Sequence, residues 1–144
     1  MIMKAKRLHP KAIMPAQGSV HAAGYDLHAC IDEDVVVNPG ENKLIGTGWA
    51  MAVPIGYGAF VYARSGMAIK QGLRTANCVG VIDADYRGEF MVGVYNDSNE
   101  PKVIHCGDRI AQMVIAPYLT VELMEADELD ETERGAGGFG STGV

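Results

Sequence analysis

This chain of 144 residues lacks basic clusters, regularly spaced cysteines and long apolar runs. Its 12 lysines and arginines against 18 acids give a net charge of −6 and no basic footprint of the kind that duplex-binding proteins carry. No apolar run approaches the ~20 residues needed to span a membrane. No apolar stretch of signal-peptide length follows residues 1–10. These absences predict a cytoplasmic protein that binds neither nucleic acid nor a membrane.

The few cysteines exclude two further classes of protein. Cys30, Cys78 and Cys106 are odd in number and widely spaced, which agrees with a reducing compartment and not with a disulfide framework. The pairs His28-x-Cys30 and His105-Cys106 do not have the spacing of zinc ligands. The sequence also has no Gly-x-Ser-x-Gly elbow, so a serine hydrolase is not predicted.

The acidic residues are unevenly distributed. Seven of them lie between Glu122 and Glu133, with no basic residue among them. Removing these seven acids from the net charge of −6 leaves +1, so the rest of the chain is nearly neutral. A small anionic ligand would therefore need local basic groups or a metal ion. We interpret residues 122–133 as a solvated connector, because like charges repel one another and no sustained apolar face is present.

Short extended segments dominate the remaining sequence. In residues 25–32, apolar and polar side chains alternate with the period of two that is typical of a half-buried strand. Further strands are expected at residues 34–37, 44–53, 59–64, 89–95, 110–115 and 118–123. Residues 65–70 can form one or two helical turns, with Ser65 as the N-cap and Gly72 after the end. Many short strands separated by glycine and proline predict an all-β sandwich or barrel, and a jelly roll is one such fold.

The last eleven residues, 134–144, contain five glycines and almost nothing that could pack, so we expect them to be mobile without a ligand. Glycine N–H groups can approach phosphate oxygens closely, Arg134 can bind a phosphate, and Phe139 can stack on a base. The phosphate-loop pattern is not met, because no lysine follows Gly140. An ordinary disordered terminus is the alternative interpretation.

A second candidate segment runs from Gly80 to Gly88. An apolar strand leads into two acids, an aromatic residue and a base, and a glycine closes the segment. In the functional interpretation this is a hairpin that holds the Asp83 carboxylate beside the ring of Tyr86, where the carboxylate can orient and deprotonate a water. An Asx-type turn with surface charges is the alternative.

Three weaker segments complete the set. Residues 63–66, Ala-Arg-Ser-Gly, end a strand and form either an anion-binding nest or a simple helix N-cap. In residues 107–114 a turn enters a strand; Asp108 and Arg109 can form a surface pair, and Gln112 can donate to a phosphate. Residues 23–27, Ala-Gly-Tyr-Asp-Leu, form a turn that leads into the first strand and indicate little alone.

Together and in this order, the five segments resemble the five motifs of the trimeric deoxyuridine triphosphatase (dUTPase) family. The resemblance covers most of the chain, and the segments at residues 80–88 and 134–143 are the specific ones. It implies an all-β subunit with a distorted, β-clip-like jelly roll over residues 1–121, an acidic connector at 122–133 and a glycine-rich lid at 134–144. It also implies a homotrimer whose active sites are shared between subunits.

The resemblance also implies roles for residues of the central hairpin. Asp83 would activate the water that attacks the α-phosphorus of dUTP. Tyr86 would pack on the deoxyribose and leave no room for a 2′-hydroxyl. Asn77, with the backbone of Gly80 and Val81, would bind the edge of uracil and reject thymine and cytosine, because polar mismatches discriminate strongly.

The triphosphate would be bound by two groups of residues. The implied ligands are Arg64, Ser65, Gly66 and Gln112 in the body, with Arg134, Gly140, Ser141 and Thr142 in the tail. Phe139 would stack on uracil, a contact worth ~1–3 kcal/mol. Mg²⁺ is the implied cofactor, held through the triphosphate without a direct protein ligand. Asp26 can contact it through a water molecule, and Asp108 resembles a position near the phosphates.

The implied activity is hydrolysis of dUTP to dUMP and pyrophosphate, which keeps dUTP out of the nucleotide pool and supplies dUMP. Two alternatives remain open. One is a deoxycytidine triphosphate deaminase, which shares the fold; here, however, Ser65 is followed by glycine instead of a second serine, and Glu89 lies beyond the motif. The other is a regulatory trimer of the same fold that binds the nucleotide without turnover.

Overall fold

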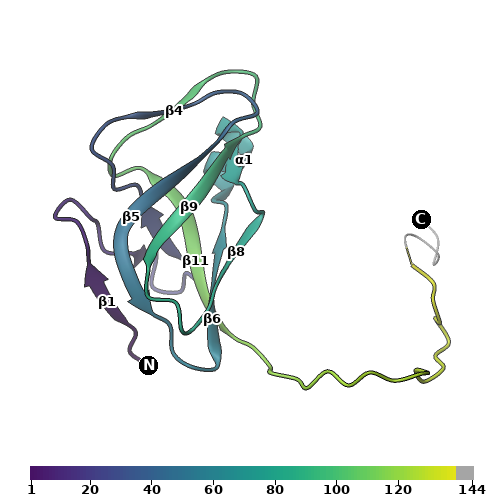
Figure 1. Ribbon diagram of the computed structural model, residues 1–144. Coiled ribbons are helices and arrows are strands. Elements are labelled where there is room, and N and C mark those ends of the chain that lie inside the picture. The colour runs from purple at the N-terminus through teal and green to yellow at the C-terminus, as the bar shows by residue number, and fades with distance from the viewer. Residues whose placement is uncertain (139–144) are drawn as a thin grey trace.

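The computed structural model describes residues 1–138, which form two main β-sheets, a small two-stranded sheet and one short helix (Figure 1). The strands are β1 (Lys4–Arg7), β2 (Ala16–Gln17), β3 (Tyr25–His28), β4 (Val35–Val37), β5 (Asn42–Ala52), β6 (Tyr57–Tyr62), β7 (Leu73–Thr75), β8 (Val79–Ile82), β9 (Glu89–Asn96), β10 (Lys102–Ile104) and β11 (Arg109–Pro117). The helix is α1 (Ser65–Gln71). The all-β prediction is confirmed.

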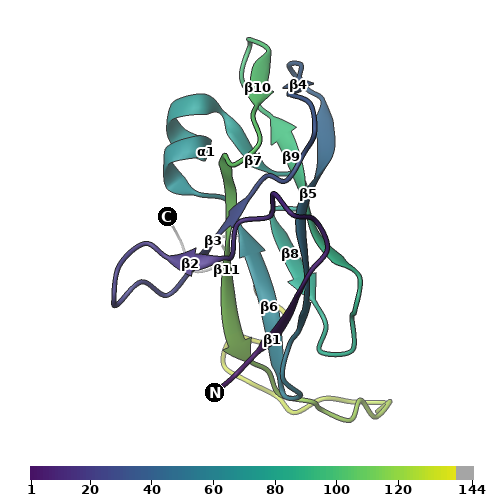
Figure 2. The ribbon, with the colours of Figure 1, turned by 90° about the vertical axis from the view of Figure 1, so that its left-hand side faces the viewer.

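The sheets pair strands that are distant in the sequence. One sheet has the order β1-β5-β9-β7 and the other β2-β3-β11-β6-β8, while β10 pairs with β4 alone. All of these pairs are antiparallel. Figure 2 shows the two-stranded sheet of β4 and β10 at the same end of the molecule as α1. Such long-range antiparallel pairing in two sheets is typical of a jelly roll.

The core lies between the inner faces of the two large sheets. In β9, Phe90, Val92 and Val94 are each at most 2% exposed, while the residues between them are more open. They belong to one apolar cluster with Leu27 of β3 and Met113 of β11. Each such side chain contributes about 1.5–3 kcal/mol on burial. The alternation also sends every second residue of β9 to the outer face.

Strand β5 bulges where it passes the start of β9. Gly46 is paired with Met91 and Ala50 with Glu89, so three residues of β5 lie opposite the single residue Phe90. The hydroxyl of Thr47 donates to the carbonyl of Phe90 at 2.6 Å and replaces a ladder bond. Bulges of this kind bend a strand and redirect side chains near functional sites.

The N-cap of helix α1 lies one residue earlier than predicted. Arg64, not Ser65, is the N-cap, with extended φ and ψ of −87° and 133° and no side-chain capping bond. An extended backbone is usual for an N-cap residue, and here the side chain of Arg64 is also held by Asp26 of β3. Gly72 ends the helix in the left-handed region, as expected. In residues 1–138 no helix is long and apolar enough to cross a membrane.

One predicted strand is wrong in part, and another is wrong entirely. The strand expected over residues 25–32 ends at His28, because Ala29 bonds to Asp108 while Cys30 bonds to Gly46 of the other sheet. The strand expected at residues 118–123 does not form: residues 118–136 are exposed and run away from the sheets after β11 (Figure 1). Its alternating apolar side chains meet no partner strand within the described part of this chain, and Leu119 is 91% exposed.

Candidate active site

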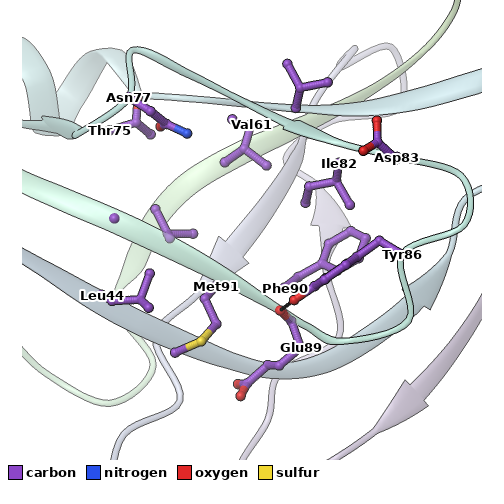
Figure 3. Close-up of a pocket in the computed structure, with 14 residues that line it drawn as sticks. Leu44, Val61, Thr75, Asn77, Ile82, Asp83, Tyr86, Glu89, Phe90 and Met91 are labelled. Carbon is purple, nitrogen blue, oxygen red and sulfur yellow. Dashed lines mark hydrogen bonds between the residues drawn. The ribbon is translucent and has the colours of Figure 1, made fainter.

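The first candidate pocket, of about 340 Å³, lies between β8 and β9. Five of the predicted site residues line it: the expected catalytic residue Asp83 and the expected substrate ligands Asn77, Gly80, Val81 and Tyr86. Asn77 lies at one end, and Asp83 and Tyr86 lie at the other (Figure 3). The structure thus brings together the residues expected to bind the base and sugar and to activate water.

The tight turn between β7 and β8 presents Asn77 to this pocket. The buried hydroxyl of Thr75 donates to the carbonyl of Cys78 at 2.6 Å, and the N–H of Cys78 donates back to the carbonyl of Thr75 at 3.2 Å. Cys78 has a φ of 61°, which is uncommon for residues other than glycine. A Cβ on Gly80 would lie 3.3 Å from Val61, so glycine keeps the pocket floor open.

The loop between β8 and β9 carries Asp83 and Tyr86. It is closed by a turn in which the N–H of Tyr86 donates to the carbonyl of Asp83 at 3.2 Å. The Tyr86 hydroxyl donates to the carbonyl of Glu89 at 3.1 Å, and its ring lies 6.2 Å from that of Phe90. A Cβ on Gly88 would come within 2.6 Å of the Tyr86 ring, so only glycine lets the ring lie there. Tyr86 remains 45% exposed and offers a flat wall beside the Asp83 carboxylate.

Glu89 lies at the same pocket but is directed elsewhere. Its Oε1 accepts a hydrogen bond from the N–H of Gly48 at 2.7 Å, and its carboxylate points away from Asp83 (Figure 3). A general acid or base must reach the reacting group. This geometry disfavours the deaminase alternative, which requires a catalytic glutamate.

A second pocket, of about 450 Å³, is lined by the predicted phosphate ligands Arg64, Ser65, Gly66 and Gln112 and also by Asp26. The Asp26 carboxylate accepts a hydrogen bond from Arg64 Nε at 2.8 Å. Gln112 Nε2 donates to the carbonyl of Ala63 at 3.0 Å. The three segments expected to bind phosphate therefore meet in space, although they come from β3, the start of α1 and β11.

Two residues of this second pocket, Arg109 and Gly24, had no role in the binding site predicted from the sequence. Arg109 pairs with Asp26 at 3.2 Å, so it adds a second guanidinium to the pocket and does not form the simple surface pair with Asp108. Asp108 instead accepts a hydrogen bond from the N–H of His105 and holds a turn. A Cβ on Gly24 would lie 2.9 Å from Gln112 Oε1, so this glycine makes room for the glutamine.

The surroundings of Asp26 also affect a histidine on the same strand. Burial lowers the pKa of His28 below its ordinary value, even though the nearby Asp26 acts to raise it. Its Nδ1 is buried and has no hydrogen-bond partner among residues 1–138. His28 is therefore held neutral near pH 7 and leaves Arg64 and Arg109 as the cationic groups beside Asp26.

Within one chain the two pockets stay separate. They share no lining residue, and the neighbouring residues Val61 and Tyr62 of β6 line different pockets. Successive side chains of a strand point to opposite faces, so the pockets open on opposite faces of this strand. Arg134 lies in the tail, where its side chain donates to the carbonyl of Gly137. The predicted ligands Phe139, Gly140, Ser141 and Thr142 lie outside the described residues.

Comparison with known proteins gives one consistent result. A protein-family model described as dUTPase matches residues 10–143. The deoxyuridine 5′-triphosphate nucleotidohydrolase of Syntrophotalea carbinolica is 52% identical over 141 residues, covering 98% of this chain and 96% of the relative. The enzyme of the same name from Nautilia profundicola is 51% identical over 143 residues, covering 99% of each chain.

Solved structures agree with these relatives. A mutant dUTPase of Staphylococcus bacteriophage 80alpha with dUpNHpp has a TM-score of 0.87 and 32% identity, covering 99% of both chains. A mutant dUTPase of phage phi11 of S. aureus, described for the coordination of a structural Mg(II) ion, has a TM-score of 0.79 and 28% identity, covering 89% of this chain and 98% of that one. The jelly-roll prediction is thereby confirmed, and the chain belongs to the dUTPase family.

Proposed function

We propose that this protein hydrolyses dUTP to dUMP and pyrophosphate. The observation that carries the proposal is the pocket between β8 and β9, where Asp83 and the wall of Tyr86 lie opposite Asn77. Relatives named deoxyuridine 5′-triphosphate nucleotidohydrolase support the same activity over nearly the whole chain. A nucleotide-binding regulator without turnover is not favoured, because both Asp83 and Tyr86 are present in the pocket.

The chemistry follows from the residues of the first pocket. The exposed carboxylate of Asp83 accepts a proton from a water molecule, which then attacks the α-phosphorus. Tyr86 packs on the deoxyribose and excludes a 2′-hydroxyl, while Asn77 and the backbone of Gly80 and Val81 bind the uracil edge.

The second pocket supplies the groups that bind the triphosphate. Arg64 offers a fork of N–H donors suited to phosphate oxygens, and Ser65, Gly66 and Gln112 add hydroxyl, backbone and amide donors. Asp26 fixes the orientation of Arg64 before substrate arrives. Pre-ordered donors stabilise charge that develops as pyrophosphate leaves.

Mg²⁺ fits this site as an ion held by the substrate. Among residues 1–138 no group of three or more histidine, cysteine, aspartate or glutamate side chains is arranged to hold a metal, so the protein would contribute few direct ligands. Mg²⁺ commonly keeps several waters and binds substrate phosphates, and Asp26 at the phosphate pocket can bond to one of those waters. The ion would neutralise charge on the triphosphate.

We further propose that the protein is a homotrimer with shared active sites. Because the base pocket and the phosphate pocket open on opposite faces of β6, one subunit would supply Asp83 and another would supply Arg64. The tail beyond the connector, with Arg134, Phe139, Gly140, Ser141 and Thr142, would close the site as a lid over bound nucleotide. The division into a body at 1–121, a connector at 122–133 and a lid at 134–144 remains part of this proposal.

Hydrolysis is tested by incubating the protein and Mg²⁺ separately with dUTP, dCTP, dTTP and UTP. We expect dUMP and pyrophosphate from dUTP alone, and a loss of more than about 100-fold in the Asp83→Asn variant. Tyr86→Ala should begin to accept UTP. A folded protein without turnover would support the regulatory alternative, and deamination of dCTP would place the protein in the other branch of the fold.

A further inference from the structure

Glu89 follows the loop that carries Asp83 and Tyr86, and its side chain binds the neighbouring strand β5. Its Oε1 accepts the N–H of Gly48 at 2.7 Å, and a Cβ on Gly46 would lie only 2.6 Å from the same oxygen. Gly48 has a φ of 72°, a conformation that most other residues adopt only with strain. The bulge of β5 is therefore shaped around the Glu89 carboxylate.

Glu89 and the next residue of β9, Phe90, also support Tyr86. The Tyr86 hydroxyl donates to the carbonyl of Glu89 at 3.1 Å, and its ring lies 6.2 Å from the ring of Phe90. Phe90 is only 1% exposed, and its carbonyl accepts the hydroxyl of Thr47 at 2.6 Å. Glu89 and Phe90 are thus both fixed to the bulge, and Tyr86 rests on both of them.

We infer that Glu89 is a positioning residue that sets the sugar selectivity of the pocket by fixing Tyr86. This inference rests on the proposed function, since it concerns discrimination between dUTP and UTP. Only the acceptor oxygen of Glu89 is needed, because its carboxylate points away from Asp83 and bonds to a backbone N–H (Figure 3). Without this anchor the start of β9 shifts, and a misplacement of about 1 Å can change rates about 100-fold.

Three substitutions of Glu89 distinguish the length of its side chain from its negative charge. Glu89→Gln keeps an acceptor at the same distance, Glu89→Asp keeps the charge but is too short to reach Gly48, and Glu89→Ala removes both. We expect the ratio of kcat/KM for dUTP over UTP to fall at least about tenfold in the Asp and Ala variants. The Gln variant should stay within about threefold of the wild type. Glu41→Ala is the matched control, because Glu41 also binds a backbone N–H, that of Asn38, away from the pocket.

A second measurement does not depend on turnover. The ring resonances of Tyr86, assigned with Tyr86→Phe, should shift in Glu89→Ala and Glu89→Asp and stay in place in Glu89→Gln. An inactive wild type would contradict the proposed function, while these resonances would still decide the positioning role. The inference is overturned if selectivity and resonances are unchanged in Glu89→Ala while its melting temperature falls, or if Glu89→Gln is as impaired as Glu89→Ala.

Discussion

Replacing Asp26 by asparagine tests whether one carboxylate holds both arginines of the phosphate pocket. One oxygen accepts Arg64 Nε at 2.8 Å, and the other accepts Arg109 Nη1 at 3.2 Å. The side chains of Asp26 and Arg64 are 17% and 23% exposed, whereas that of Arg109 is 54% exposed. The first pair is therefore largely shielded from water, and the second is half open.

These exposures determine the expected size of the effect. A hydrogen bond to a charged group contributes about 1.5–3 kcal/mol, and an exposed ion pair contributes about 0.2–1 kcal/mol. Asparagine keeps one oxygen acceptor, so part of the bond to Arg64 survives, but the negative charge that both guanidinium groups share is removed. We expect the free energy of unfolding to fall by about 1–3 kcal/mol, a range typical of a damaged polar network.

The assay is urea unfolding at one fixed protein concentration, because assembly makes the apparent stability depend on concentration. The control is Asp34→Asn, whose ion pair with His105 is more than half exposed on both sides and should change the free energy by less than about 0.5 kcal/mol. Added pyrophosphate should restore part of the loss in Asp26→Asn, because it supplies negative charge to Arg64. A loss no larger than that of the control would refute the shared role of Asp26.

Three further results are expected. A hydrogen bond with Asp34 raises the pKa of His105 above its ordinary value. Their pair therefore stabilises the fold below pH ~6.5, and this stabilisation is lost as the pH rises through the raised pKa. NMR titration of His105 should show the raised pKa, and Asp34→Asn should return the pKa toward its ordinary value. Gly24→Ala should displace Gln112 and raise KM for dUTP about tenfold in steady-state kinetics. Ending the chain after Glu133 should abolish turnover with the melting temperature within about 2 °C of the wild type.

The longer strands can be predicted from the sequence because each has a buried face. Strand β9 alternates between core and outer positions, and β11 has three residues in the core. Strand β1 cannot be found in this way: its four residues, Lys-Ala-Lys-Arg, are all exposed, and its place at the sheet edge depends on pairing with β5. The strand expected at residues 118–123 fails for the opposite reason, since its alternating pattern has no partner strand among residues 1–138.

The site was predictable where neighbours in the sequence are neighbours in space. Asp83 and Tyr86 belong to one short loop, so the sequence alone suggests a hairpin that holds them together, with an Asx-type turn as the alternative. Their roles were predicted from the resemblance to the dUTPase family. Arg109 was missed because its partner Asp26 is far away in the sequence. The register of β11 against β3, with a shift between Arg109 and Ala111, places it beside Asp26. No local pattern encodes such a shift.

The separation of the two pockets makes shared sites directly testable. Asp83→Asn disables the base pocket and leaves the phosphate pocket intact, whereas Arg64→Ala does the reverse. Each variant alone should be nearly inactive. The two are then co-expressed in equal amounts with different tags, so that subunits mix during assembly, and mixed oligomers are purified by both tags.

If a site combines pockets from two different subunits, a closed ring of three that contains both variants has an intact Asp83 beside an intact Arg64 in about one site of three. Activity of the doubly purified mixed oligomers should then return to about a third of that of the wild type, although no subunit is intact. If both pockets of a site came from one subunit, every site would carry one of the two defects and the mixture would stay inactive. Since the pockets open on opposite faces of β6, recovery is the expected result, and its absence would refute the shared-site arrangement.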